Sequence, residues 1–202
     1  MVSFNNVTIP ARRTDLLHLK RTVYRMECGQ CSSQDGLPNI IIVKVQKQGW
    51  EDEFAQEIAA YHRLQPLQGL LIPKFFGTGY FMDRPALVIS EIVGTTLERL
   101  AQSKLDFSRD VLESQLTIAL RTFYDRGVEY WDDRLDKFFF CENEKFMIVD
   151  LEQTHFFHED EAWEDNVNYG NVQGLMWRFS CMRAERSNCS GPLQLRETEI
   201  EK

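Results

Sequence analysis

The chain has 202 residues and a net charge of −8, with 43% hydrophobic and 27% charged residues, which suits one domain or two tightly joined lobes around a buried core. No window approaches about 20 apolar residues, and the N-terminal segment MVSFNNVTIPARRTD has no apolar run, which argues against a transmembrane helix and a secretory signal. We therefore expect a cytoplasmic protein without membrane association, and its acidic charge alone argues against a nucleic-acid partner.

The first quarter of the chain predicts mainly β-structure. Residues 16–27 predict an early strand, or a short helix followed by a strand, and the Gly- and Ser-containing residues 28–38 predict a loop. The β-branched run at residues 39–46 predicts a buried strand. Residues 1–50 hold seven Lys and Arg against three acids, so they carry +4 and leave −12 for the remainder. This basic quarter is either an anion-facing surface or an ordinary solvated face.

The clearest helix in the sequence covers residues 51–65 and ends at Pro66. Its apolar residues recur at helical spacing and its first turn is acidic, as the helix dipole favours. These apolar residues are Phe54, Ile58, Tyr61 and Leu64. A strand within residues 67–79 and a buried strand at residues 86–92 follow it.

The second half of the chain predicts helices first. Thr95 or Thr96 is placed to cap a short helix through Gln102. A long amphipathic helix is predicted at residues 108–126, beginning at a serine cap and ending at Gly127.

The remaining residues predict short strands around an acidic segment. The sequence VEYWDDRLDKFFF predicts a strand or loop, a tight turn and a short strand, and FMIVDLEQ predicts a strand that ends in Asp150. Residues 153–168 are acidic and irregular, residues 169–185 predict a last helix, and residues 186–202 form a polar tail.

Five cysteines and a closely spaced pair of histidines raise the question of a metal site. An odd number of cysteines without a secretory signal favours reduced thiols. Cys28 and Cys31 form a lone CxxC, which we interpret as incidental loop cysteines, with a zinc or redox site as alternatives. His155 and His158 have the spacing of a metal pair, but no third ligand is convincingly placed. We therefore predict no metal site.

Four polar residues are spaced so that a fold can bring them together. Lys44 lies within a buried strand, and Glu57 lies on the apolar face of the following helix. Because an unpaired buried charge is costly, we expect Lys44 to pair with Glu57. Asp132 follows a helix–strand junction, and Asp150 ends a strand 18 residues later. The alternative for Lys44 and Glu57 is a purely structural ion pair.

The order of these features resembles the protein-kinase and aminoglycoside-phosphotransferase superfamily over roughly residues 39–152. The segments that carry the resemblance are IIIVKV with Lys44, FAQEIAAYHRL with Glu57, ALVISEIVG as a last small-lobe strand and hinge, WDDRLDKF with Asp132 at the catalytic position, and IVDLE with Asp150 at the metal-binding position. The resemblance implies an α+β, protein-kinase-like fold. It implies a small β-rich N-lobe at residues 1–93, a reduced and mostly helical C-lobe at residues 94–185, and a polar tail at residues 186–202.

The sequence departs from this superfamily at the residues that handle nucleotide. The stretch RMECGQCSSQDG lacks a Gly-rich phosphate loop. Lys137 stands five residues after Asp132, where kinases have the Asn that holds a second Mg²⁺. Only 52 residues follow Asp150, too few for a normal large lobe. A kinase-like phosphotransferase that uses ATP and Mg²⁺, and a pseudokinase-type binding module, remain alternatives.

The segment VEYWDDRLDKFFF also resembles the signature of the fungal arginine-containing cyclodipeptide synthases, a kinase-like family with an acidic DDxxE-type motif. Here the motif is Asp132-Asp133-Arg134-Leu135-Asp136, with Asp at the final position. The resemblance implies a secondary-metabolite enzyme that takes aminoacyl groups from two charged tRNAs, one of them arginyl-tRNA, and closes a diketopiperazine. An aminoacyl ester is already activated, so this reaction implies no cofactor.

Carboxylates suit this chemistry because one can accept a proton from an attacking amine and another can hold a guanidinium. We predict Asp132, Asp133 and Asp136 as catalytic residues. The predicted substrate-binding residues are Asp150, Glu152, Lys137, Lys44 and Glu57. The basic first quarter is then expected to meet tRNA phosphates.

Two of these features have simpler interpretations. The DDRLD cluster is alternatively a solvated acidic turn balanced by Arg134 and Lys137. Trp131 and the run Phe138–Phe140 are predicted to belong to the core, with a stacking platform as the alternative for the aromatic rings.

Overall fold

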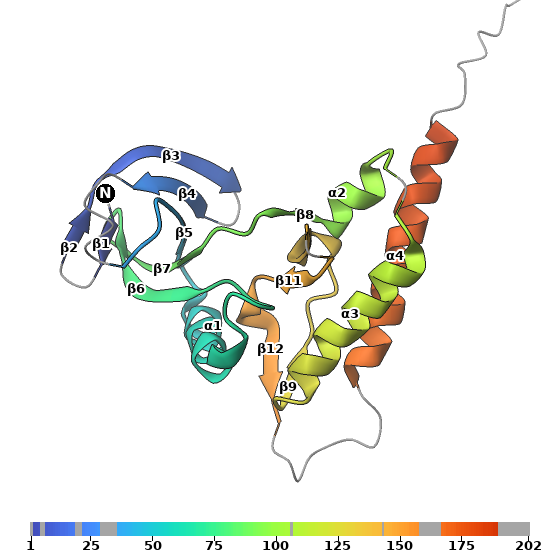
Figure 1. Cartoon of the computed structure of the whole chain (residues 1–202). Coiled ribbons are helices and arrows are strands. Elements are labelled where there is room, and N and C mark those ends of the chain that lie inside the picture. The colour runs from blue at the N-terminus through green and yellow to red at the C-terminus, as the bar shows by residue number, and fades with distance from the viewer. Residues whose placement is uncertain are drawn as a thin grey trace, which may run out of the picture.

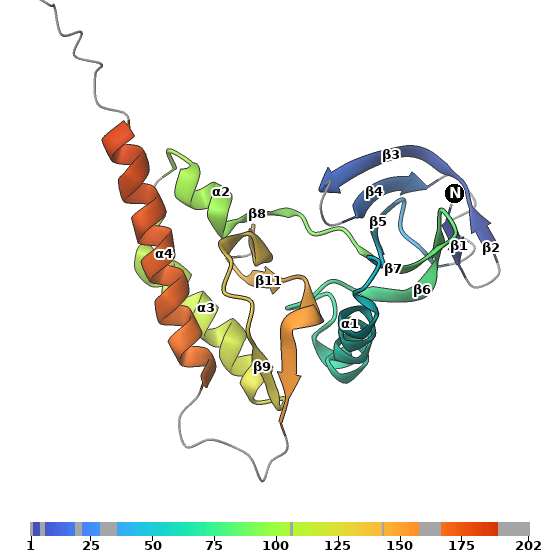
Figure 2. The same ribbon diagram turned by 180° about the vertical axis from the view of Figure 1, so that it is seen from behind.

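The computed structural model describes residues 2–4, 7–18, 22–28, 36–105, 107–142, 144–157 and 167–189. Within these residues the chain is an α+β structure with two parts. A curled antiparallel sheet and helix α1 form one part, and the other helices with two small sheets form the second (Figure 1). Figure 2 shows the same two parts from behind, with α4 on the outer side of the second part.

The large sheet has seven strands in the order β2-β1-β6-β7-β5-β4-β3, and each neighbouring pair is antiparallel. The strands are β1 (Val2–Phe4), β2 (Val7–Ile9), β3 (Ala11–His18), β4 (Val23–Cys28), β5 (Ile40–Val45), β6 (Phe75–Phe81) and β7 (Arg84–Ser90). The predicted strands at residues 39–46 and 86–92 correspond to β5 and β7. The β-segment predicted at residues 16–27 corresponds to parts of two strands, β3 and β4, and β1 and β2 were not predicted.

Alternation along the strands produces two separate cores. Because successive strand residues point to opposite faces, Ile41 and Val43 of β5 and Val88 of β7 face the inside of the curled sheet, where they pack with Met26 and Phe81. The other face of these strands meets α1 and the second part of the molecule. Lys44 lies on that other face, so its side chain points away from the interior of the curled sheet.

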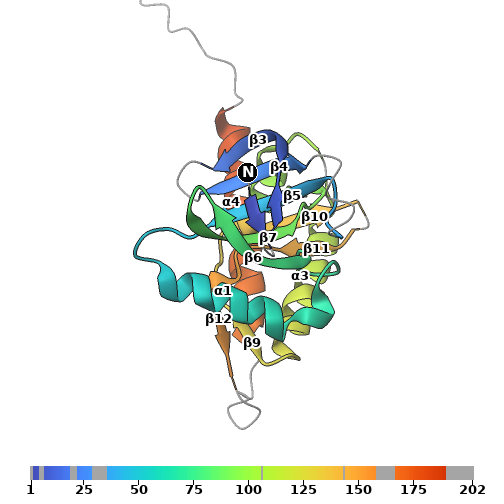
Figure 3. The ribbon, with the colours of Figure 1, turned by 90° about the vertical axis from the view of Figure 1, so that its left-hand side faces the viewer.

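Helix α1 (Glu51–Arg63) lies across one side of the sheet, as Figure 3 shows. Its buried residues are Glu57, Ala60 and Tyr61, so the predicted inward position of Glu57 is confirmed. The helix ends before Pro66, which lies within a short 3-10 turn, η2 (Gln65–Leu67).

The second part is built from helices α2 (Leu97–Gln102), α3 (Arg109–Tyr124) and α4 (Val167–Cys189). The predicted caps are confirmed, since Thr96 Oγ1 accepts a hydrogen bond from the Arg99 amide at 3.2 Å, and the hydroxyl of the residue before α3 accepts from Val111 at 3.4 Å. Gly127 follows α3 with φ +69°, where a Cβ would lie 3.0 Å from the Phe157 carbonyl oxygen.

Short strands connect the helices and frame the polar centre. Strand β10 (Phe138–Cys141) pairs with β8 (Gly94–Thr96) and β11 (Phe146–Ile148), and β9 (Val128–Tyr130) pairs with β12 (Thr154–Phe156). Two 3-10 turns, η3 (Leu135–Lys137) and η4 (Leu151–Gln153), precede β10 and β12. None of the helices in the described part of the chain is long and apolar enough to cross a membrane.

The predicted CxxC and histidine pair are only partly described. Cys28 is a buried free thiol at the end of β4, and burial raises its pKa. Its partner Cys31 and the second histidine, His158, lie outside the described residues.

The basic first quarter does not present all its charges as one surface. Arg12 and Arg13 are exposed on β3, whereas Arg25 is paired with Glu27 at 2.9 Å and Lys44 is buried. Lys20 and Arg21 lie outside the described residues.

Candidate functional site

The centre of the site is a buried lysine on β5. Lys44 is 8% exposed and Glu57 is 1% exposed. Antiparallel pairing with β7 fixes the position of β5, and the buried face of α1 turns Glu57 toward it. Lys44 Nζ lies 2.6 Å from Glu57 Oε2. The pairing of these two residues predicted from the sequence is therefore confirmed.

Two further carboxylates reach the same lysine from the segment after β11. Lys44 Nζ donates a hydrogen bond to Glu152 Oε2 at 3.0 Å and another to Asp150 Oδ1. Strand β11 ends at Ile148, so the prediction that the strand ends in Asp150 was wrong by two residues. Asp150 has φ +69°, in the left-handed region. A non-glycine residue held there is uncommon, and such conformations cluster at functional sites.

Glu57, Asp150 and Glu152 bring carboxylate oxygens within 4.8 Å of one another, a spacing that is compatible with a metal ion. Lys44 contacts all three, so an ammonium group already supplies positive charge to them. Burial alone would lower the pKa of Lys44, but the charges of Glu57 and Glu152 raise it above its ordinary value. Burial alone would raise the pKa of Glu152, but the charge of Lys44 and its hydrogen bond lower that pKa below its ordinary value of 4.5.

A second buried lysine lies on the other side of Asp150. Lys137, at the end of η3, is 0% exposed. Its ammonium contacts Asp150 Oδ2 and lies 3.8 Å from Asp132 Oδ2. Its carbonyl oxygen accepts a hydrogen bond from the Val149 amide at 3.1 Å. Lys137 therefore joins the two segments that carry the predicted acidic residues.

Asp132 is the buried acid at the end of this chain of ion pairs. Its carboxylate accepts hydrogen bonds from two guanidinium nitrogens of Arg134, and its Oδ1 also accepts from the Arg134 backbone amide at 3.2 Å. Burial would raise the pKa of Asp132, but the hydrogen bonds from Arg134 and the charge of Lys137 lower it below 3.8. The side chain of Arg134 is 48% exposed, whereas that of Asp132 is 4% exposed.

Asp133 makes a different ion pair from Asp132. Its two carboxylate oxygens accept hydrogen bonds from the two terminal nitrogens of Arg178, which lies on α4. Asp136 is half-buried within η3. The structure thus brings Asp132, Asp150, Glu152, both lysines and Glu57 into one network, while Asp133 lies in a neighbouring pair.

Trp131 contradicts its predicted place in the core. Its side chain is 57% exposed, and its ring stacks on His155 with an interplanar angle of 12°. Within the run Phe138–Phe140, Phe138 is buried and the other two phenylalanines are half-buried. Tyr130, the last residue of β9, is buried, and its hydroxyl donates a hydrogen bond to the Val149 carbonyl oxygen at 2.8 Å.

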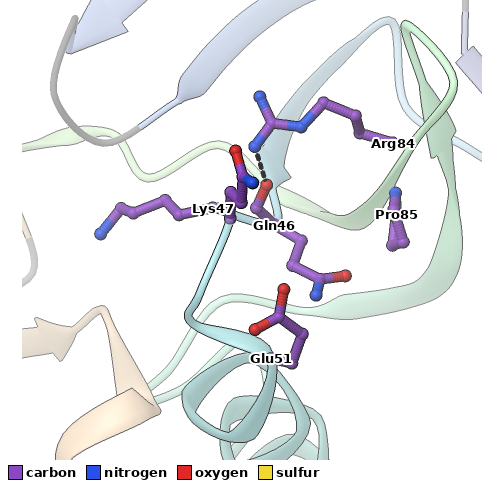
Figure 4. Close-up of a pocket in the computed structure, with 6 residues that line it drawn as sticks. Gln46, Lys47, Glu51, Arg84 and Pro85 are labelled. Atoms are coloured by element: carbon purple, nitrogen blue, oxygen red, sulfur yellow. Dashed lines mark hydrogen bonds between the residues drawn. The ribbon is translucent and has the colours of Figure 1, made fainter.

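A cavity beside the described start of α1 lies outside the lysine network. It measures about 540 Å³ and lies beside the start of α1 and the outer ends of β5 and β7 (Figure 4). Its lining residues are Gln46, Lys47, Gln48, Glu51, Arg84 and Pro85. A cavity of about 10 Å³, which suits one water molecule, is lined in part by Lys44, Glu152, Trp50 and Phe54.

Sequence reasoning missed the two arginines that hold the acidic motif. Arg134 was considered only as a charge that balances the acids, although its position two residues from Asp132 is a usable signal. Arg178 is 45 residues from Asp133, and nothing local to either residue indicates their pairing.

Comparison with known proteins gives no assignment. No protein-family model matches the chain, and no curated protein sequence matches it significantly.

Proposed function

We propose that the protein is a tRNA-dependent synthase that joins an arginyl group and a second aminoacyl group into a cyclic dipeptide. In this proposal the two-part fold is a kinase-like scaffold, with the curled sheet and α1 as a small lobe and α2 to α4 as a reduced large lobe. The strand lysine Lys44, the helix glutamate Glu57 and the acid Asp150 lie together, which supports that interpretation.

The observation that carries the proposal is the guanidinium held by Asp132. This carboxylate is almost fully buried, and it accepts two hydrogen bonds from a side chain that is half exposed. Paired hydrogen bonds between a carboxylate and a guanidinium are geometrically specific and strong. Arg134 can leave toward solvent, and the arginyl side chain of a substrate then replaces it on Asp132.

Lys137 supports a reaction that does not depend on a divalent metal at this position. Its ammonium lies between Asp150 and Asp132, the two carboxylates that a kinase-like site uses for metal and substrate. Aminoacyl transfer from an ester requires no phosphoryl chemistry, so an ammonium can supply the positive charge that these buried acids need.

The reaction balances with the residues present. The α-amino nitrogen of one aminoacyl ester attacks the carbonyl carbon of the other, and an amide bond forms. The ester bond of the attacked carbonyl breaks and releases its tRNA, which leaves a dipeptidyl ester on the other tRNA. A second attack within the dipeptidyl ester closes the ring and releases the second tRNA. Each amine loses one proton, which Asp136 or Asp133 accepts as a general base, and each departing ribose hydroxyl gains one. Holding both esters in reacting geometry lowers the barrier further.

The direct test is to express the chain in a bacterial host and to analyse extracts by mass spectrometry for arginine-containing diketopiperazines. We expect such a product from the wild type, and its loss in Asp132→Asn and Asp133→Asn. Asp125→Asn, a matched change at an exposed helix end, is expected to leave product formation unchanged. With purified protein and charged tRNA, ribonuclease should abolish the reaction, and omission of ATP should not. Full product formation by both active-site variants would remove the catalytic assignment.

A second candidate is a kinase-like phosphotransferase that uses ATP and Mg²⁺. The observation that favours it is the close approach of Glu57, Asp150 and Glu152, whose carboxylate oxygens lie within 4.8 Å of one another. If this candidate is correct, ATP with Mg²⁺ raises the melting temperature of the wild type and no diketopiperazine forms. A protein that shows neither response fits a binding module instead.

A further inference from the structure

An exposed aromatic pair stands directly beside the acidic motif. The rings of Trp131 and His155 stack with centroids 5.2 Å apart and an interplanar angle of 12°. Trp131 is 57% exposed, and His155 is also exposed. His155 covers one face of the indole, so the exposed area of Trp131 belongs to its other face and its edge.

The backbone and one hydrogen bond hold this indole in place. Strands β9 and β12 are antiparallel, with Glu129 opposite His155. Residues two apart on a strand share a face, so Glu129 and Trp131 lie on the same side as His155. Trp131 Nε1 donates a hydrogen bond to Glu129 Oε2 at 3.0 Å, and Glu129 is only 6% exposed. The indole is therefore oriented before any ligand arrives, which lowers the cost of binding one.

The position of this pair relative to Asp132 suggests what it binds. Trp131 directly precedes Asp132, but its side chain is 57% exposed whereas Asp132 is 6% exposed. Because a tRNA stays outside the protein, an arginyl group whose guanidinium is held by the buried Asp132 must extend its ester toward the surface. In an aminoacyl-tRNA the amino acid is esterified to the ribose of the 3′-terminal adenosine. A base must then lie within one sugar of the reacting carbonyl.

We infer that the Trp131–His155 pair is a stacking platform for the 3′-terminal adenine of an aminoacyl-tRNA. This inference rests on the proposed function. Single-stranded RNA ends are typically bound through bases stacked on aromatic side chains. The chain carries a net charge of −8, so general attraction to phosphates is weak and stacking contributes a larger share of the binding free energy.

The test uses a short RNA that ends in CCA, with a fluorescent aminopurine in place of the terminal adenine. Stacking on the indole quenches this probe, and a titration gives its affinity. Loss of one base–aromatic stack weakens binding about tenfold, so we expect that loss in Trp131→Ala and a smaller loss in His155→Ala. Trp131→Phe should retain most of the affinity. Trp177→Ala is the matched control, because Trp177 is 66% exposed on α4 and lies outside the pair.

The possible outcomes separate the platform from the synthase. If no diketopiperazine forms but the CCA probe still depends on Trp131, the platform stands and the proposed function fails. If product forms in Trp131→Ala with an unchanged KM for charged tRNA, the synthase stands and the platform is overturned. Equal affinities of the probe for Trp131→Ala and Trp177→Ala also overturn it. Displacement of the probe by ATP alone at similar concentrations assigns the pair to a free nucleotide and overturns the tRNA assignment.

Discussion

Two cations lie near the same carboxylate, that of Asp132, and they differ in their exposure to solvent. The side chain of Lys137 is 1% exposed, and that of Arg134 is 48% exposed. Charges taken fully out of water depend on their partners, whereas an exposed ion pair contributes little to folding. The buried lysine network is therefore the structural frame of the site, and the arginine pairs at its edge are the replaceable part.

The largest expected effect comes from removing the buried cation. Lys137→Met keeps a similar volume but leaves Asp132 and Asp150 with less positive charge inside the protein. Breaking one side of a buried ion pair costs about 3–5 kcal/mol, so we expect the free energy of unfolding to fall by about that amount at pH 7. Urea denaturation measures this change.

The matched control is Lys104→Met, which changes an exposed lysine near the end of α2. Its effect should stay within about 0.5 kcal/mol, as for most surface substitutions. Equal effects of the two substitutions would contradict the distinction between a buried frame and a replaceable edge.

A smaller effect is expected from acid. The pKa values of Asp132 and Glu152 lie below their ordinary values of 3.8 and 4.5. A carboxyl group with a lowered folded-state pKa stabilises the protein fully above its unfolded-state pKa, and this contribution is lost as the pH falls toward the folded-state pKa. Stability should therefore decline below about pH 4.5, and Glu152→Gln should decline less steeply than the wild type over the same range. Urea denaturation at a series of pH values from neutral to acidic measures both slopes, and identical slopes would contradict the role of Glu152.

The sequence predicted the buried lysine network better than the arginine pairs at its edge. The reason is that the spacing of apolar residues indicates which positions of a strand or helix are buried. The β-branched run around Lys44 and the helical spacing around Glu57 indicate which faces are buried, and two buried charges on facing elements must pair. Lys137 was recognised as a cation in place of a metal-binding Asn. Its contact with Asp150 depends on how η3 packs beside the segment after β11, which no local pattern specifies.

Trp131 shows where periodicity fails. Strand β9 has only three residues, too few to reveal which residues face inward, and an aromatic-rich segment suggests core whichever way it points. The same limit explains why β1 and β2, also of three residues each, were not predicted. Asp133 and Arg178 meet only because α4 packs near β9, a contact that depends on the whole second part of the fold.

The smallest effect on stability, and the sharpest on binding, is expected at the two exposed arginines. Arg178→Ala removes one member of an ion pair in which both side chains are half-exposed, so it should change the free energy of unfolding by less than about 1 kcal/mol. Arg134→Ala removes hydrogen bonds from the buried carboxylate of Asp132, which keeps Lys137 nearby, so it should cost about 1–3 kcal/mol. The two variants should differ in their affinity for a ligand that carries a guanidinium group. Arg134 competes for Asp132, and a ligand's apparent affinity falls with the fraction of sites that are occupied. Arg134→Ala should therefore bind arginine amide at least about threefold more tightly than the wild type, whereas Arg178→Ala should not, as isothermal titration calorimetry can measure. Weaker binding by Arg134→Ala would mean that Arg134 contacts the ligand itself, and Asp132 would then not be the guanidinium site.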